Sequence, residues 1–145
     1  SGCLYIIIRT AWLYSGYGHN FVKTISRLAS EWDELNVVND QWGTPTYAGD
    51  LAEAIISIME RDDLPELEGV YHFTNEGACT WYDFAKEIVA ITGANCKVNP
   101  VTTEEYPSKV KRPAYSILDK TKIKETFNLE IRDWREALKS CMATF

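Results

Sequence analysis

Apolar residues occur along the chain in two patterns, short continuous runs and longer stretches at helical spacing. Residues 4–8 form a continuous, mostly β-branched apolar run. Such a run predicts a strand that is buried on both faces, as in a parallel sheet. A further strand is predicted at 69–73. Shorter strands are predicted at 36–39, 46–47 and 97–101, the last at a sheet edge because Pro100 has no backbone N–H to donate.

The helical stretches have identifiable ends. Asn20 offers a side-chain oxygen to the first turn of a helix that runs to about Trp32. A second helix holds Asp50 in its first turn, where a carboxylate interacts favourably with the helix dipole. A third begins at Thr80 and stops at Gly93. Two further helices are predicted at 119–127 and 132–142.

Four of these helices carry an apolar stripe that is expected to face the core. The residues expected to face inward are Phe21, Ile25, Leu28, Ala29 and Trp32, then Leu51, Ala54, Ile55, Ile58 and Met59, then Trp81, Phe84, Ala85, Ile88 and Val89, and finally Trp134, Ala137, Leu138 and Cys141.

Strands and helices alternate, which predicts an α/β fold in a single region that covers residues 1–145. A buried parallel strand needs neighbours on both of its edges. The residues before 4–8 supply none. We therefore expect the chain to be a fragment with an incomplete sheet.

Composition narrows the classes of function. The net charge of −6 argues against nucleic acid as a partner. No apolar run approaches the roughly 20 residues of a membrane span, and the start lacks the pattern of a signal peptide, so we expect a cytoplasmic protein that is not bound to a membrane. The four cysteines are scattered and are expected to be reduced and buried or half-buried. His19 and His72 lie far apart in sequence, so a zinc site is not expected.

Positive charge gathers between residues 109 and 124. Such a patch on an acidic chain suits a small anionic ligand such as a diphosphate. The alternative is a solvated helix face, which we prefer for Lys120, Lys122 and Lys124. For Arg112, which precedes Pro113, both interpretations stay open.

The stretch 9–21 directly follows the first predicted strand. It carries Trp12, Tyr14, Tyr17, His19 and Asn20, whereas a plain connection would be small and polar. Ligands of open α/β sheets bind at the carboxyl ends of the strands. The stretch 40–46 is a second loop of this kind.

Four motifs at these positions resemble the C-terminal half of the dTDP-4-dehydrorhamnose reductases, a family of extended short-chain dehydrogenases/reductases. The motifs are Arg9-Thr10-Ala11-Trp12-Leu13-Tyr14, Asn20-Phe21, Asp40-Gln41-x-Gly43-x-Pro45-Thr46 and Arg112-Pro113-x-x-Ser116-x-Leu118. The resemblance runs from about residue 4 to residue 142. It implies an incomplete Rossmann sheet plus a small α/β substrate-binding lobe, with the N-terminal NAD(P)-binding Rossmann domain absent.

The resemblance also implies a reaction. These enzymes use NADPH to reduce the C4 ketone of dTDP-6-deoxy-L-lyxo-4-hexulose to dTDP-L-rhamnose. The chain has no G-x-x-G-x-x-G motif, and its Tyr82-x-x-x-Lys86 lies after the sugar-pocket motifs, whereas the catalytic pair of the family precedes them. We interpret this spacing as chance. No catalytic residue is therefore expected here, and the chain alone is expected to be inactive.

The resemblance assigns roles residue by residue. It implies that the flat face of Trp12 packs on the sugar, although a core aromatic is the alternative. Thr10 and Ala11 would lie near the nicotinamide. Asn20 would direct donors at the diphosphate, and it can also be a plain N-cap. Arg112 would bind the diphosphate with two hydrogen bonds.

Weaker assignments complete the predicted site. Gln41, Gly43 and Pro45 resemble a loop wall beside the substrate, although turn chemistry alone also explains the glycine and the proline. The remaining candidates are Tyr14, Tyr115 and Ser116.

Other functions stay open. Relatives of this family serve as non-catalytic regulatory subunits, and the many tryptophans would then suit a protein interface. Another extended reductase or epimerase would act on a different nucleotide sugar. By resemblance, the full-length protein is expected to be a homodimer, with Mg²⁺ as a further candidate at the dimer interface.

Overall fold

The computed structural model describes residues 3–106 and 108–145, and its strands form pairs. Three pairs are parallel, namely β1 (Ile6–Arg9) with β6 (Gly69–His72), β2 (Leu13–Tyr14) with β5 (Thr46–Tyr47), and β3 (Glu34–Val38) with β8 (Lys97–Val101). The fourth pair, β4 (Trp42–Gly43) with β7 (Cys79–Thr80), is antiparallel. Within the described residues β8 pairs with β3 alone, as Pro100 predicts.

Within the part of the chain that the structure describes, five α-helices lie at the predicted places. They are α1 (Phe21–Glu31), α2 (Ala48–Met59), α3 (Trp81–Thr92), α4 (Thr121–Phe127) and α5 (Trp134–Met142), and a 3₁₀ turn, η1 (Leu64–Glu66), precedes β6. The predicted caps are confirmed for α1 and α3: Asn20 Oδ1 accepts from Lys23 N at 3.1 Å, and Thr80 with Asp83 forms a capping box. None of the helices in the described chain is long and apolar enough to cross a membrane.

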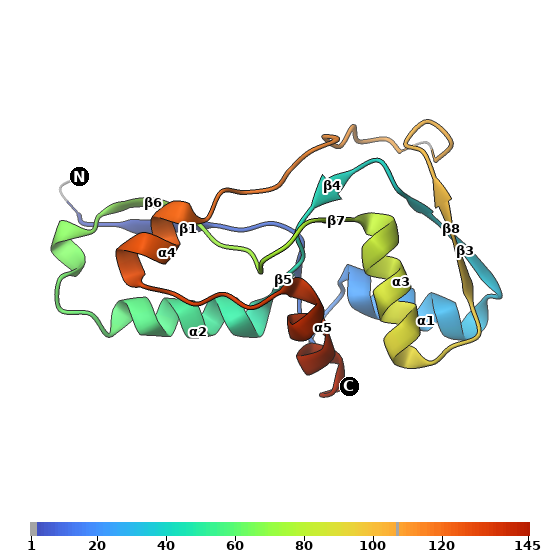
Figure 1. The fold of residues 1–145 in the computed structure, drawn as a ribbon, viewed down its shortest axis with the longest axis horizontal. Coiled ribbons are helices and arrows are strands. Elements are labelled where there is room, and N and C mark those ends of the chain that lie inside the picture. The colour runs from blue at the N-terminus through green and yellow to red at the C-terminus, as the bar shows by residue number, and fades with distance from the viewer. Residues whose placement is uncertain (1–2, 107) are drawn as a thin grey trace.

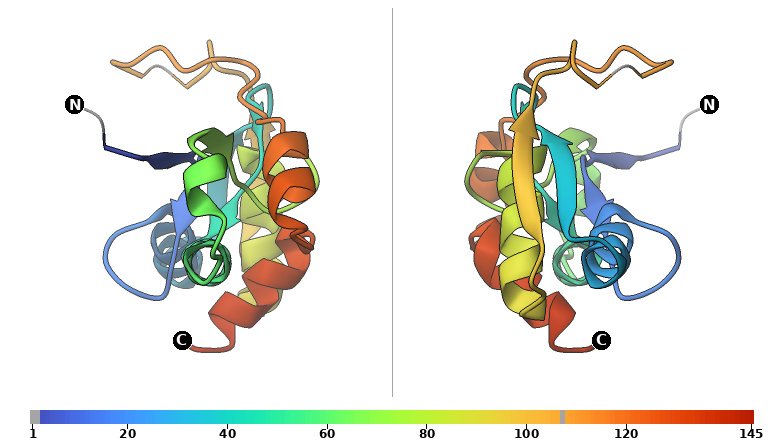
Figure 2. Two further views of the ribbon diagram at one scale, coloured as in Figure 1. Left: turned by 90° about the vertical axis from the view of Figure 1, so that its left-hand side faces the viewer. Right: turned by 90° about the vertical axis from the view of Figure 1, so that its right-hand side faces the viewer.

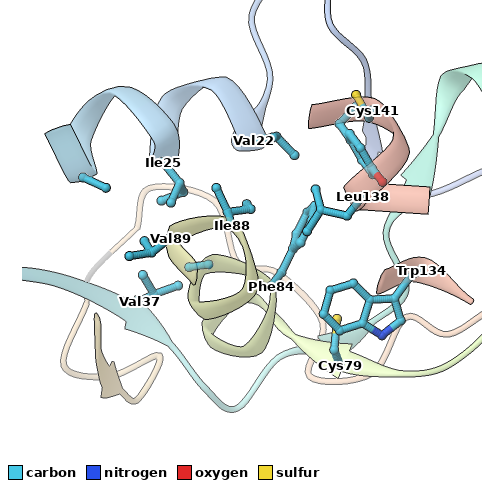
Figure 3. Close-up of a cluster of buried hydrophobic side chains, with 13 residues drawn as sticks. Val22, Ile25, Val37, Cys79, Phe84, Ile88, Val89, Trp134, Leu138 and Cys141 are labelled. Atoms are coloured by element: carbon cyan, nitrogen blue, oxygen red, sulfur yellow. The ribbon is translucent and has the colours of Figure 1, made fainter. Parts of the chain in front are cut away.

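The elements form two lobes (Figure 1). We call α1, α3, α5, β3 and β8 the closed lobe, and β1, β6, α2 and α4 the open lobe. The end view of the closed lobe shows β3 and β8 side by side, with α1 and α3 against them (Figure 2). The core of the closed lobe centres on Phe84, which lies between Ile88 of α3 and Leu138 and Trp134 of α5 (Figure 3).

The open lobe has a smaller core, and here the structure corrects the sequence. Ile6 and Ile8 of β1 pack toward Ala54 and Ile58 of α2, but Ile7 on the other face of the strand is 49% exposed. The prediction of a strand buried on both faces is therefore wrong, because α2 covers one face of β1 only.

Other burial predictions also fail for local reasons. Trp32 is 61% exposed because it follows the last turn of α1 in an extended conformation, and Met59 is 69% exposed at the end of α2. Cys3 is exposed, whereas the other three cysteines are buried or half-buried, and burial raises the pKa of the Cys79 thiol to about 12.

The clearest correction to the sequence prediction concerns Lys120. It does not lie on a solvated helix face, because its ammonium is buried before α4 and donates to Thr74 Oγ1 and Asn75 O, each at 3.2 Å. Glu76 lies 3.7 Å away as an ion-pair partner. Removal from water lowers the pKa of Lys120. The positive patch at 109–124 is thus split, with one of its charges inside the protein.

Candidate nucleotide-sugar site

A groove of about 780 Å³ lies between α1 and β3, below the segment that follows β8. Its walls are mostly apolar at the helix and the strand, and polar or basic at the segment. The lining residues are Phe21, Thr24, Ile25 and Leu28 of α1, residues 34–38 of β3, then Gln41, Trp81, Thr103, Glu104, Tyr106, Ser108, Val110, Lys111 and Arg112. A long, flat ligand with an anionic end would match this distribution.

Thr103 ties one end of the overlying segment to the turn after β3. The Asp40 carboxylate accepts from Thr103 Oγ1 at 2.6 Å and from Thr103 N at 3.0 Å, and these hydrogen bonds lower the pKa of Asp40. Gln41 Nε2 donates to Thr103 Oγ1 at 3.2 Å. Gln41 is therefore buried at the floor of the groove with its amide already engaged.

The other end of the segment is tied to β4. Trp42 N donates to Ala114 O at 2.8 Å, and Ser116 N donates to Trp42 O at 2.9 Å. Ser116 Oγ donates to the same carbonyl at 3.1 Å, so its hydroxyl serves the backbone. Arg112 lies two residues before this tie and is exposed where it lines the groove. Gln41 and Arg112, which are 71 positions apart, are thus brought to one groove.

Trp12 is tightly packed and half-buried beside the groove. Its ring stacks on Trp81 with centroids 3.7 Å apart and planes at 18°. On Gly43 an added Cβ would lie 2.6 Å from the Trp12 ring, so the backbone of β4 touches the indole directly. Trp12 also has a φ of 49°, in the left-handed region that non-glycine residues rarely adopt. Its predicted contact with a sugar stays a prediction.

The structure places Tyr14 in the core. The side chain is 2% exposed, and its ring lies 5.5 Å from that of Phe84 and 5.8 Å from that of Tyr47. Its hydroxyl is buried with no hydrogen-bond partner among the described residues, and burial raises its pKa. Tyr14 is thus a packing residue in this structure, contrary to its assignment as a ligand contact.

The remaining candidates lie around the same edge. Asn20 is an N-cap whose Nδ2 also donates to Ser15 O at 2.7 Å, and its role toward a diphosphate stays a prediction. Thr10 follows β1 with its hydroxyl buried, and Ala11 O accepts from Thr46 Oγ1 at 2.7 Å. Tyr115 is exposed beside β4.

Most residues that line the groove were outside the predicted site, among them Trp81 and Thr103. Trp81 had been interpreted as a core residue of its helix, and Thr103 gave no sequence signal because its partners are more than 60 positions away. The chance spacing Tyr82-x-x-x-Lys86 lies on α3, where the Lys86 ammonium sits 5.2 Å from the centre of the Tyr82 ring. These two side chains therefore contact each other.

Comparison with known proteins gives the family. A family model described as the RmlD substrate binding domain matches residues 1–145. The chain belongs to this family. The chain is 47% identical to a dTDP-4-dehydrorhamnose reductase of Aggregatibacter actinomycetemcomitans over 95% of its own length and 50% of that protein. As an RmlD substrate binding domain, it spans about half the length of the curated relatives it matches.

Solved structures agree on the fold of this RmlD domain. A dTDP-4-dehydrorhamnose reductase from Clostridium acetobutylicum superposes with a TM-score of 0.88 at 46% identity, over 97% of this chain and 48% of that one. The enzyme from Bacillus anthracis, solved in complex with NADP, superposes with a TM-score of 0.90 at 40% identity, over 97% and 49%. The predicted α/β fold of an extended short-chain dehydrogenase/reductase is confirmed.

Proposed function

We propose that this chain is the sugar-nucleotide-binding part of an NADPH-dependent dTDP-4-dehydrorhamnose reductase, inactive alone and completed by an N-terminal Rossmann domain. The observation that carries the proposal is the groove. Its apolar wall on α1 and β3 leads to Lys111 and Arg112 on the segment above. Family membership of the whole chain supports the same function.

The groove suits a nucleoside diphosphate because its two ends differ in chemistry. Phe21 and Val37 offer an apolar surface on which a flat base packs. The guanidinium of Arg112 can donate two parallel hydrogen bonds to a phosphate. Beyond the diphosphate, the sugar would meet the indole of Trp12, which Trp81 connects to the groove.

This chain contributes little to the dinucleotide itself. The Thr10 hydroxyl is covered and the Ala11 carbonyl already accepts a hydrogen bond, so these two residues offer only an edge contact to a nicotinamide. They do not fit NADPH by themselves. The hydride donor of the whole enzyme would therefore be held by residues outside this chain, and what this chain does is bind and orient the sugar nucleotide.

For the whole protein we also propose a cytoplasmic homodimer, which family resemblance alone supports. Light scattering on the full-length protein tests the dimer. Among residues 3–106 and 108–145, no group of three or more His, Cys, Asp or Glu side chains is arranged to hold a metal ion. A Mg²⁺ ion shared between two subunits stays a prediction.

Titration calorimetry of the full-length protein with dTDP tests the role of the groove. Arg112→Ala is expected to weaken binding about 10- to 100-fold, because a charge-assisted hydrogen bond contributes roughly 1.5–3 kcal/mol. Lys109→Ala is the matched control, since Lys109 is an exposed cation of the same segment that does not line the groove. Equal affinity in wild type and Arg112→Ala would remove Arg112 from the site. Absence of dTDP binding by the wild type would overturn the function.

A further inference from the structure

Trp81 is the first residue of α3, and its side chain has two different neighbours. It lines the groove. Its ring also lies beside that of Phe21, with centroids 4.8 Å apart and planes at 53°. Its second neighbour is Trp12, on which it stacks nearly parallel with ring centroids 3.7 Å apart. Trp81 is half-buried, so it is neither a free surface residue nor a fully enclosed core residue.

The indole of Trp12 is fixed from two directions. Trp81 covers it by stacking, and the backbone of Gly43 leaves no room for a Cβ atom, which would lie 2.6 Å from Trp12 Cε2 and Cζ2. The backbone of Trp12 is in the left-handed region, at φ 49°. A side chain is held in such a conformation only when its surroundings determine it, and strained residues of this kind cluster at functional sites.

We propose that Trp81 is a positioning residue of the nucleotide-sugar site. It forms part of the groove wall and also holds the ring of Trp12 at the angle at which the sugar packs on it. Occupation of the groove by the nucleotide and the orientation of Trp12 are therefore coupled through one side chain. The inference rests on the proposed function, and it names a residue that the motif comparison did not single out.

Trp134 shows what a purely structural tryptophan looks like in this fold. It is fully buried and meets Phe84 edge-on, with centroids 5.9 Å apart. It lines no part of the groove. Trp81 differs on each count, because it is half-exposed, stacked face to face on a strained neighbour and open to the groove.

The stack has its own spectroscopic signature. Two indoles in contact couple their electronic transitions, and transition moments that are oblique to each other then give a paired positive and negative band in circular dichroism. In the full-length protein this couplet is expected to disappear in Trp81→Leu and in Trp12→Phe. It is expected to persist in the control Trp32→Leu, because Trp32 is exposed at the end of α1. A couplet that persists in Trp81→Leu would overturn the stack.

The coupling is tested by a double-mutant cycle on the affinities for dTDP and dTDP-rhamnose. Trp81→Leu and Trp12→Ala are each expected to weaken dTDP-rhamnose binding about 3- to 10-fold, the scale of an aromatic pair. The double variant is expected to be no weaker than either single one, because each substitution removes the same Trp12–Trp81 stack. Affinity for dTDP, which lacks the rhamnosyl group, should fall by less than about threefold in Trp81→Leu. Trp81→Phe should restore part of the dTDP-rhamnose affinity.

The outcomes are separable. Additive effects in the double variant, or equal losses for dTDP and dTDP-rhamnose, would overturn the positioning role while the proposed function stands. A wild type that binds neither ligand would overturn the proposed function and the coupling together. Should Trp81→Leu fail to fold, Gly43→Ala displaces the Trp12 ring by a separate contact, because the added Cβ would lie 2.6 Å from Trp12 Cε2 and Cζ2. It is then expected to lose the couplet and dTDP-rhamnose affinity together, and retention of both would contradict the inference.

Discussion

The closed and open lobes are built from the same kinds of element but bury their apolar residues to different extents. Around Phe84 the closed lobe packs helices from three parts of the chain, α1, α3 and α5. In the open lobe, α2 covers one face of β1, and Tyr5, Ile7 and Met59 remain exposed. The two lobes therefore have the same secondary structure but different degrees of enclosure.

The difference bears on where the candidate site lies. The groove and the Trp12–Trp81 stack lie at the closed lobe, where aromatic rings pack closely against one another. Binding sites need such rigid support, because a ligand contact that is loosely held loses much of its effect. Exposed apolar surface of the kind found on the open lobe instead marks places where a protein contacts another surface.

The largest effect is expected from removing the centre of the closed lobe. The ring of Phe84 lies near those of Trp12, Tyr14, Phe21, Trp81 and Trp134. Phe84→Ala should lower the free energy of unfolding by about 4–5 kcal/mol, the upper part of the range for a buried phenylalanine. Urea unfolding followed by circular dichroism measures it.

The matched variant lies in the open lobe. Phe127 is buried there, and its ring lies 4.9 Å from that of Tyr71. Because it has fewer aromatic neighbours, Phe127→Ala should cost about 3 kcal/mol, the lower part of the same range. If Phe127→Ala costs as much as Phe84→Ala, the two lobes are equally well packed and the comparison fails.

A smaller effect is expected at the polar tie between the lobes. Arg132, just before α5, binds the Asp50 carboxylate of α2 with two hydrogen bonds of 2.8 Å, and Asn75 Nδ2 donates to the same carboxylate at 2.7 Å. Arg132→Ala should cost about 1–2 kcal/mol, less than a fully buried pair because Arg132 is partly exposed. Thermal unfolding measures the loss.

The exposed pair Arg27–Glu31 on α1 is the control for this tie. Arg27→Ala removes an ion pair with a single contact of 3.3 Å. It should change the unfolding free energy by less than about 0.5 kcal/mol, since exposed pairs contribute little in water. Equal losses in the two variants would show that Arg132 contributes only as an ordinary surface charge and does not join the lobes.

The ends of the helices could be predicted from the sequence, whereas the covering of both faces of a strand could not. The caps at Asn20 and Thr80 and the stop at Gly93 depend on neighbouring residues, and the structure has them as predicted. Burial of Ile7 depends on which surfaces cover both faces of β1, and no periodicity within residues 4–8 contains that information.

The site shows the same division. Its motifs marked the loops that meet near the groove, but the tie of Thr103 to Asp40 joins residues 63 positions apart. The predicted roles of Tyr14 and Lys120 are wrong for the same reason, because they too depend on contacts between residues far apart in the sequence. Tyr14 faces the closed core and Lys120 reaches Thr74, a contact across 46 positions. Contacts between residues this far apart in the sequence depend on how the lobes pack, so a local motif does not predict them.

The buried ammonium of Lys120 is expected to make folding stability depend on pH, and this dependence can be measured. Its pKa is lowered from the ordinary value of 10.5 because burial disfavours the charged amine. The unfolded chain therefore binds this proton more tightly than the folded one does, and folding stability rises with pH between the lowered pKa and 10.5. Below that window the cost of the buried charge is fully present. Relative to Lys120→Met, the wild type should gain stability as the pH rises through the window.

Urea unfolding at a series of pH values measures this gain. Lys124→Met is the control, because it removes a more exposed amine that pairs with the same Glu76 at 3.2 Å and leaves Lys120 in place. The pH trend should therefore persist in Lys124→Met. Parallel stability profiles for wild type and Lys120→Met would show that burial of Lys120 has no effect on the proton equilibrium.

The smallest effect on stability is expected at the surface of the open lobe. An apolar hollow of about 370 Å³ lies between β1 and α2, with Leu4, Tyr5 and Met59 at its wall. An apolar fluorescent dye should bind there, and Met59→Gln should weaken the dye signal while changing the unfolding free energy by less than about 0.5 kcal/mol. The control is Leu13→Gln, which changes an exposed apolar residue outside the hollow.

Displacement by dTDP distinguishes the two places where the dye could bind. Dye bound in the hollow should resist displacement by dTDP, whereas dye bound in the closed-lobe groove should be displaced. If dTDP displaces all of the dye, the open lobe offers no apolar contact surface and the distinction between the lobes is lost.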